Sequence, residues 1–330
     1  ISACLVGSEM CIRDSAYALR DANTGNTRMM DAALAFARAR SVQDLHKAHA
    51  NLGLPWVNTL AADRSGQAMY ADVSVVPDVD AVQLARCAPS QPAAALRAAA
   101  GLVVLNGSRA DCDWRRDSAS PVPGLIPIGR MPVAFRTDWV HNSNDSFVYT
   151  HPGQKFEGIS PLVGDASLTR PRTRAGLAEI PEMLGRGKVT LQAIQGQLFE
   201  NRNFMAQVGV PDLLAACDKA PTAESRDGCA ALKGWDRRSN VDARGAHVFR
   251  EFWRTARNIP GVHRVPFDPA QPVATPAGLK MDDATTAAKV WEALDGAVKA
   301  IRTSGYTLDA TLGSVQRPAI TEEALSLIHI

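Results

Sequence analysis

The sequence lacks the features that would assign it to a membrane or to a polyanionic partner. No stretch approaches the roughly 18–20 uninterrupted apolar residues that a transmembrane helix needs, and the N-terminus lacks the basic region and apolar run of a signal peptide. Basic residues gather on no segment, and 36 Lys and Arg against 34 Asp and Glu leave a formal net charge of +2. We therefore expect no membrane span and no nucleic-acid partner.

The sequence also lacks the short motifs of several common enzyme classes. It holds no GxSxG elbow, no Walker loop, no HExxH and no GxGxxG segment. His46 and His49 lie at positions i and i+3 of a predicted helix, but Lys47 lies between them and the helix is polar there. We interpret both as surface histidines and predict no metal site.

What the sequence does contain is the composition of a folded globular protein. Of its 330 residues, 46% are hydrophobic and 21% are charged, and there is no internal repeat or low-complexity tract. Disorder and fibrous repeats are therefore excluded, and the length suffices for one large domain or two ordinary ones.

Both ends of the sequence are unusual. Residues 1–15 start without Met and show no helical or strand periodicity, and residues 321–330 stop in an apolar run. Both resemble adapter read-through at the ends of assembled environmental sequences. We expect residues 16–320 to be an internal fragment of a longer chain, in which case Cys4 and Cys11 carry no meaning. An ordinary frayed terminus is the alternative.

The first half of the chain predicts a pair of helices followed by a β-hairpin. Residues 31–50 are rich in helix formers, and Ser41 with Asp44 forms an N-cap pattern that restarts the helix. Two alternating segments then flank Asp63–Gly66, whose Gly suits a turn position with positive φ. The proline-rich region 88–135 predicts a long excursion with a short helix near Pro92–Leu102.

From Arg172 onward the pattern is that of amphipathic helices. The clearest helix follows Asp282, a plausible cap, and stops at Gly305, with its apolar side chains on one face. A hairpin region followed by a largely helical second half predicts an α+β fold in which helices cover a sheet. The other predicted helices span residues 172–184, 189–202, 211–218, 224–234 and 244–257.

Four of the six cysteines lie in the expected native range, and their spacing is too wide for a CxxC metal knuckle. We predict disulfides between cysteines that follow one another along the chain, Cys87 with Cys112 and Cys217 with Cys229. Each would stabilise the fold by about 3 kcal/mol on the chain-entropy model. Disulfides imply an oxidising compartment, such as a periplasm or the cell exterior. The alternative is four buried free thiols in a cytosolic protein.

The densest polar cluster of the sequence is Val140–Ser146, which follows an apolar and aromatic stretch. Such a pattern is typical of a strand end that delivers side chains to a cleft, or of an ordinary turn. A Ser-His-Asp triad inside it is not expected, because residues so close in sequence cannot all converge on one atom. Trp56, at the start of the predicted hairpin, is by residue type a core candidate.

Ordered segments of the chain resemble the β-subunit of the penicillin amidase family. Within that family, the acyl-homoserine-lactone acylases and aculeacin-type acylases look most similar. The resemblance runs from about Tyr17 to about Ile320, so it covers nearly all of the expected native chain. The segments that carry it are Leu54–Asp63, His141–Ser146, Gly158–Leu162, Pro171–Arg174, Gly234–Asp236 and Asn240–Asp242.

The resemblance implies an N-terminal-nucleophile hydrolase, of whose αββα fold this chain would be a fragment. Members of the family are made as an exported precursor, which is cut so that a Ser begins the β-chain. The free α-amine of that Ser acts as base for its own hydroxyl, which attacks an amide carbonyl to give an acyl-enzyme that water cleaves. This chemistry requires no metal or organic cofactor.

Motif matching implies roles for four residues of this chain. Asn144, the second Asn of the polar cluster, would donate its neutral side-chain amide to the oxyanion. Arg172 would orient Asn144 and lower the pKa of the nucleophile's amine, with a solvated arginine at a helix start as the alternative. Trp56 and Val57 would line the acyl pocket.

The resemblance leaves the substrate open. N-acyl-homoserine lactones are the leading expectation, a β-lactam or lipopeptide acylase is an alternative, and a non-catalytic scaffold or binding fragment is a rival of another class. The chain reads Ala32, Ala33 and Leu34 where close acylases carry a bulky aromatic, which predicts a wider acyl pocket.

The resemblance also implies what this fragment would need around it. The nucleophilic Ser and the backbone oxyanion donor belong to a part of the family β-chain outside the match, so we expect the fragment alone to be inactive. Its partner would be the acylase α-chain from the same precursor, and its location periplasmic or secreted.

Overall fold

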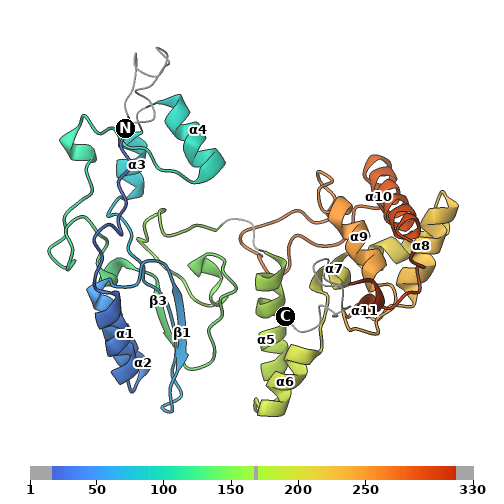
Figure 1. Cartoon of the computed structure of the whole chain (residues 1–330), viewed down its shortest axis with the longest axis horizontal. Helices are drawn as coiled ribbons and strands as arrows, with labels where there is room; N and C mark the ends of the chain where they lie inside the picture. Colours follow the sequence, from blue (N-terminus) through green and yellow to red (C-terminus); the bar gives the residue numbers. More distant parts are fainter. Residues whose placement is uncertain (1–16, 89, 167–169, 317–330) are drawn as a thin grey trace. The chain divides into compact units, whose positions relative to one another are not determined.

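The computed structural model describes residues 17–88, 90–166 and 170–316, and it divides the chain into two compact units, Ile1–Ala166 and Ser167–Ile330 (Figure 1). Each unit has buried apolar clusters of its own. The expected non-native ends, residues 1–15 and 321–330, lie outside the described residues together with Cys4 and Cys11.

The first unit begins with the two short helices that the sequence predicts. Helix α1 spans Met29–Arg38 and α2 spans Val42–Ala48. The Ser41 hydroxyl caps α2 by accepting from the Asp44 backbone N–H at 3.1 Å, which satisfies one of the free donors of the helix start. A 3-10 turn, η2 (His49–Asn51), ends the pair.

His49 lies inside the first unit. Its side chain is 2% exposed and its ring meets Phe36 edge-on, with 4.8 Å between the ring centroids. Burial lowers the pKa of His49 to about 4, so the imidazole is neutral at pH 7. The expectation that His49 is a surface histidine is therefore wrong, because apolar packing where α2 passes into η2 outweighs the polar composition of the helix.

An antiparallel sheet in the order β1-β2-β3 forms the centre of the first unit. Strands β1 (Asn58–Ala62) and β2 (Ala68–Asp72) make the predicted hairpin, and Gly66 takes a φ of +83° in the turn between them. Strand β3 (Val133–Arg136) pairs with β2. The sequence indicates a strand before Val140 only as an alternative to a turn, because four residues are too few for their alternation to be recognised beside a proline-rich region.

Strand β2 is central and is buried on both faces. Met69 and Ala71 are 0% exposed and pack in one cluster with Val42 of α2. Tyr70, also 0% exposed, points to the opposite face and packs with Phe147 in a second cluster. The residues after β3 therefore cover the Tyr70 face of the sheet, and these residues include the polar cluster picked out from the sequence.

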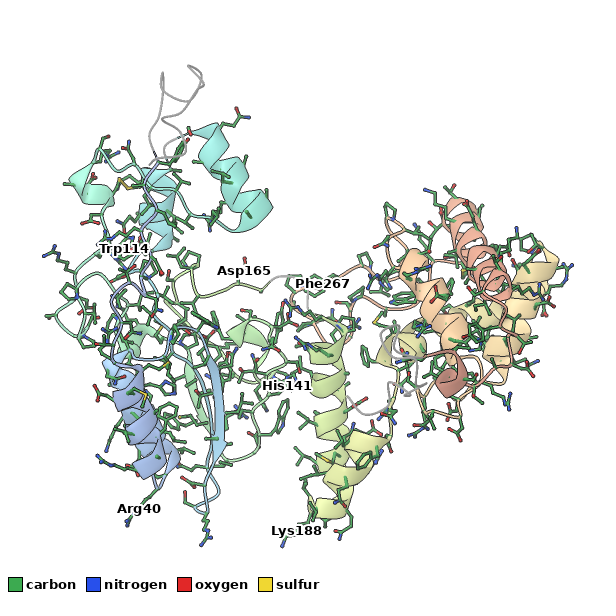
Figure 2. All side chains as sticks on the ribbon, in the orientation of Figure 1. Arg40, Trp114, His141, Asp165, Lys188 and Phe267 are labelled. Carbon is green, nitrogen blue, oxygen red and sulfur yellow. A yellow bond between two sulfur atoms is a disulfide. The ribbon has the colours of Figure 1, made fainter. Side chains whose placement is uncertain are left out.

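Between β2 and β3 the chain makes the long excursion that its prolines predict. The predicted disulfide between Cys87 and Cys112 joins two of its short elements, with 5.6 Å between the Cα atoms (Figure 2). This link closes a segment with little apolar core of its own, where a covalent tie stabilises most. The elements are α3 (Ala81–Cys87), α4 (Gln91–Ala100), η3 (Ala110–Cys112) and η4 (Ile128–Arg130).

A buried carboxylate holds the excursion together. The Asp78 side chain is 1% exposed and pairs with Arg115, at 2.6 Å, and with Arg130, which also contacts Asp117 at 3.1 Å. Burial acts to raise the pKa of Asp78, but hydrogen bonds from both guanidinium groups outweigh it and hold the pKa below its ordinary value. Asp78 is therefore ionised in the fold at neutral pH.

The second unit is largely helical, as predicted. Helix α7 begins at Phe204 and not near residue 211, because Pro211 lies inside the helix and does not start it; the start is capped by Asn203, whose side chain accepts from the Ala206 N–H at 3.0 Å. The helices are α5 (Pro171–Gly185), α6 (Leu191–Phe199), α7 (Phe204–Ala215), α8 (Ala223–Lys233), α9 (Ala246–Ala256), α10 (Ala284–Thr303) and α11 (Leu312–Val315), with the 3-10 turn η6 (Cys217–Lys219).

Helices α8, α9 and α10 enclose the main apolar core of this unit. Phe252 of α9 and Leu294 of α10 are both 0% exposed. The cap of α10 is Asp283, whose carboxylate accepts from the Thr286 N–H at 2.8 Å, and not the predicted Asp282. The second predicted disulfide, Cys217–Cys229, ties η6 to α8 with 6.0 Å between the Cα atoms.

The described residues thus combine a three-stranded sheet with a helical second half, which is compatible with the predicted α+β class. Within those residues, we find no helix that is both long enough and apolar enough to cross a membrane.

Candidate functional site

The loop that follows β3 carries Asn144, and it is closed at its base by two contacts. The His141 N–H donates to the Thr150 carbonyl at 3.0 Å. One step further out, the His151 Nε2 lies 3.3 Å from the carboxylate of Asp138. His141 itself is buried, with 9% of its surface exposed, and is labelled in Figure 2. The intervening residues therefore form a closed turn with a fixed base.

Asn144 lies at the tip of this turn in a left-handed conformation, with a φ of +62°. Its N–H donates to the Asn142 Oδ1 at 2.7 Å, and the Asn142 amide donates in turn to the Asp145 carbonyl at 3.0 Å. Asn tolerates this conformation better than most residues, yet it is still uncommon, and residues held in it often lie at functional sites. The turn therefore fixes the direction in which the exposed Asn144 side chain leaves the backbone.

His141 and Ser143 contact each other in this turn. The His141 Nε2 lies 2.9 Å from the Ser143 Oγ, and burial lowers the pKa of the imidazole. The imidazole also interacts with the backbone of Tyr149 and with the charge of Asp145, and both act to raise its pKa against the larger effect of burial.

Trp56 and Val57 lie directly before β1 and are exposed. Trp56 is 75% exposed and Val57 is 38% exposed, so Trp56 does not belong to the core of this unit. The backbone beneath them is fixed: the Val57 N–H donates to the Ser74 Oγ at 3.3 Å, and the Val75 N–H donates to the Pro55 carbonyl at 3.1 Å. We refer to these two exposed apolar side chains, which lie on a hydrogen-bonded backbone, as the apolar wall.

A polar clamp orients the segment that leads to Trp56. The Arg28 guanidinium donates to the carbonyls of Asn51, at 2.8 Å, and Leu52, at 3.1 Å. The Asn26 amide donates to the Gly53 carbonyl at 2.9 Å. This clamp leaves no local pattern in the sequence, because the carbonyls that it binds are 23 to 27 residues away.

Of the three small residues on α1, only one is packed. Ala32 is 0% exposed and lies where α1 meets Gly53, while Ala33 and Leu34 are exposed. A Cβ atom on Gly53 would lie 3.0 Å from the Ala32 Cβ and 2.5 Å from the Arg28 carbonyl oxygen, so the two segments are in close contact there. The helix therefore has no room for a bulky side chain at residue 32.

A half-buried carboxylate lies across the hairpin from the residue that follows Val57. Asp72 is the register partner of Asn58, which follows Val57, and the Ser74 hydroxyl lies 3.5 Å from its Oδ1. Burial raises the pKa of Asp72 to about 6, because no cation is close enough to offset the loss of water. No sequence motif marks this residue, since an Asp at the end of a strand is ordinary.

Arg172 lies in the first turn of α5, in the second unit, and is exposed. Its neighbour Arg174 is 2% exposed, donates to the Val273 carbonyl at 3.2 Å, and lies 5.1 Å from the Phe204 ring centroid. The first turn of α5 holds no acidic residue, although a helix start favours negative charge. An arginine at position 172 therefore gains nothing from the helix dipole.

Comparison with known proteins gives this arrangement a context. The sequence profile of the penicillin amidase family matches residues 5–327. The acyl-homoserine lactone acylase PvdQ of Pseudomonas syringae pv. syringae (strain B728a) is 34% identical over 318 residues, which are 94% of this chain and 40% of that protein. The aculeacin-A acylase of Actinoplanes utahensis is 38% identical over 280 residues, which are 80% of this chain and 35% of that protein.

The chain spans about two fifths of the length of these curated relatives, 40% and 35%. Its match to the family extends over nearly all of its own length, and the relatives agree with it at 34–38% identity. The chain belongs to the penicillin amidase family.

Proposed function

We propose that the full-length product of this gene is an amidohydrolase that cleaves the amide bond of N-acyl-homoserine lactones and releases a fatty acid and homoserine lactone. The reaction would proceed through an acyl-enzyme on an N-terminal Ser. Membership of the penicillin amidase family and the similarity to proteins named acyl-homoserine lactone acylase support this reaction class. The observation that carries the proposal is the left-handed turn that presents Asn144.

In the proposed mechanism, Asn144 donates its side-chain amide to the carbonyl oxygen that becomes negative in the tetrahedral state. An oxyanion donor must not rearrange during the reaction, and the bond from the Asn144 N–H to Asn142 supports such a fixed turn. Asn144 is exposed in the first unit, so a cleft around it would have to be completed by residues outside that unit. The nucleophilic Ser would likewise come from a part of the family β-chain outside the match.

Trp56 and Val57 would bind the acyl chain. Exposed apolar side chains on a rigid strand start suit a pocket wall, because burying them against a fatty chain removes apolar surface from water. The small residues Ala33 and Leu34 on the exposed side of α1 support a preference for longer or bulkier acyl groups than those of relatives with an aromatic there.

Arg172 would orient Asn144 and lower the pKa of the nucleophile's amine. Its position in the first turn of α5, where a cation is unfavourable for the helix, supports a role other than helix stability. An arginine keeps its charge at every relevant pH, and its planar fork can hold an amide carbonyl in one orientation. The pairing of Arg172 with Asn144 is implied by the family resemblance.

The compartment and the partner are part of the same proposal. Two disulfides in the described residues support an oxidising location, periplasmic or secreted. The partner would be the α-chain of the same precursor, which would supply further walls of the acyl pocket. No metal or organic cofactor takes part.

A lipopeptide acylase is the second candidate. The similarity to a protein named aculeacin-A acylase, at 38% identity, favours it specifically. The two candidates share the amide cleavage and differ in the amine that leaves. A β-lactam acylase belongs to the same reaction class, whereas a non-catalytic scaffold would cleave none of these amides.

The test is product analysis with the purified full-length gene product. N-acyl-homoserine lactones of four to sixteen acyl carbons are incubated with it, and free homoserine lactone is measured by mass spectrometry. Release of homoserine lactone, fastest with long acyl chains, is the expected result. A preference for short chains would refute the wider pocket. Release of amine only from a lipopeptide or only from a β-lactam would indicate a lipopeptide acylase or a β-lactam acylase. If no acyl amide is cleaved, the result would favour a non-catalytic scaffold.

A further inference from the structure

A buried tyrosine hydroxyl lies between the acyl-pocket wall and the turn that carries Asn144. Tyr70 is on the central strand β2 and is 0% exposed. Its hydroxyl donates to the Asn58 Oδ1 at 2.6 Å, and Asn58 is the first residue of β1, directly after Val57. On this side, the hydroxyl is therefore one hydrogen bond from the backbone that presents the apolar wall.

The same hydroxyl interacts with the loop that carries Asn144. The side chains of Thr150 and Asn142, both in the loop that carries Asn144, interact with this hydroxyl and act to lower its pKa, and Asn142 accepts from the Asn144 N–H at 2.7 Å. Burial, reinforced by the nearby Asp72, raises the pKa of Tyr70 well above its usual range, so the hydroxyl keeps its proton at every working pH. A short chain of polar contacts therefore runs from Asn58 through Tyr70 to Asn142 and Asn144.

The rest of the tyrosine is held by packing that does not need the hydroxyl. Its ring lies in the apolar cluster with Ala134 and Phe147, on a strand paired on both sides. A phenylalanine would keep these contacts and remove only the oxygen. A buried hydroxyl with partners on two different segments is costly to leave unpaired, so it fixes both segments at once.

We propose that Tyr70 is a positioning residue for amide hydrolysis, whose hydroxyl holds the Asn144 turn in register with the acyl-pocket wall at Trp56 and Val57. This inference rests on the proposed function. It assigns to Tyr70 no contact with the substrate: its effect passes through Asn58 on one side and Asn142 on the other. Misplacement of the oxyanion donor by a fraction of an ångström lowers the rate of the chemical step more than it weakens binding.

The test is steady-state kinetics of Tyr70→Phe in the full-length gene product, with a long-chain N-acyl-homoserine lactone as substrate. We expect kcat to fall about tenfold while KM stays within about twofold. Asn142→Ala should cause a similar fall, and the double variant should be no slower than the slower single variant, because both changes break one chain of contacts.

Val73→Ala is the matched control for general loosening of the strand. Val73 is 1% exposed directly after β2, and it packs in the cluster on the opposite face. Its kcat should stay within about twofold of the wild type at a temperature where both variants are folded by circular dichroism.

The outcomes separate this inference from the proposed function. An unchanged kcat in Tyr70→Phe, a rise in KM alone, or an equal fall in Val73→Ala would overturn the role of Tyr70 while the wild type still hydrolyses the amide. A wild type that hydrolyses no acyl amide would overturn both.

Discussion

The two units of this chain are stabilised in different ways. In the second unit, helices α7 to α10 share one large apolar cluster, with Leu213, Leu232, Phe252 and Leu294 all 0% exposed. In the first unit, the apolar clusters on the two faces of β2 are smaller, and buried polar groups lie between and beside them. Asp78, for example, is 1% exposed and bonded to two arginines.

This difference bears on which unit holds polar side chains in fixed directions. An apolar core tolerates little change of volume but places few polar side chains. A buried polar network fixes the direction of each group it contains, provided that every member has a partner. The turn of Asn144, the clamp of Arg28 and the Tyr70 hydroxyl all belong to the first unit, so the unit with the smaller apolar clusters presents the positioned side chains.

The largest expected effect is a cavity in the second unit. Phe252→Ala removes a ring that is 0% exposed and contacts Phe249 and Trp253, so it should lower the free energy of unfolding by about 3–5 kcal/mol. Lys289→Ala, on the exposed side of α10, is the control and should change it by less than about 0.5 kcal/mol. Denaturant unfolding measures both. A loss below about 1 kcal/mol for Phe252→Ala would contradict the claim that the apolar cluster stabilises the second unit.

The next effect breaks the buried ion cluster of the first unit. Asp78→Asn leaves Arg115 and Arg130 without their shared carboxylate, and because both guanidinium groups are partly exposed we expect a loss of about 2–3 kcal/mol. Asp80→Asn is the control. The Asp80 side chain pairs with Arg115 but is 39% exposed, so this substitution should lower the free energy of unfolding by less than about 1 kcal/mol. Equal losses in the two variants would show that burial of Asp78 does not matter.

The smallest effect has the opposite sign and depends on pH. The pKa of Asp72 is about 6 in the fold and 3.8 ordinarily, so between these values the folded state binds more protons and stability falls as pH rises. Asp72→Asn removes this penalty and should raise the free energy of unfolding by about 1–3 kcal/mol at pH 7.5, with little change at pH 3.5. Unfolding curves at both pH values measure it. A gain of the same size at pH 3.5 would rule out titration of Asp72 as the cause.

Much of the fold follows from local sequence signals. Ser41 with Asp44 predicts the start of α2, and the Gly of Asp63–Gly66 predicts the hairpin, because capping and turn chemistry act within a few residues. The start of α7 was misplaced because Pro211 also fits the first turn of a helix. For the stretch before Val140 a strand stays only an alternative to a turn, because the pairing of β3 with β2 depends on residues more than 60 positions away.

The candidate site likewise combines residues that sequence motifs indicate with contacts between residues far apart in the sequence. The roles proposed for Asn144 and Trp56 come from motifs in the sequence, but the contacts around these residues do not follow from any motif. Tyr70 contacts Asn58 across the hairpin, and Arg28 binds carbonyls more than 20 residues away, so neither contact leaves a pattern in the sequence. The burial of His49 was misjudged for a related reason, since helix composition does not report which side the tertiary fold covers.

The most direct test of the account is the turnover of an N-acyl-homoserine lactone by Asn144→Ala. Asn201→Ala is the matched control, because Asn201 is also an exposed Asn in a left-handed conformation, with a φ of +48°, but lies in the second unit outside the proposed site. We expect kcat to fall by about 10²–10³-fold in Asn144→Ala and by less than about threefold in Asn201→Ala. Equal rates in Asn144→Ala and the wild type would contradict the assignment of Asn144 as the oxyanion donor.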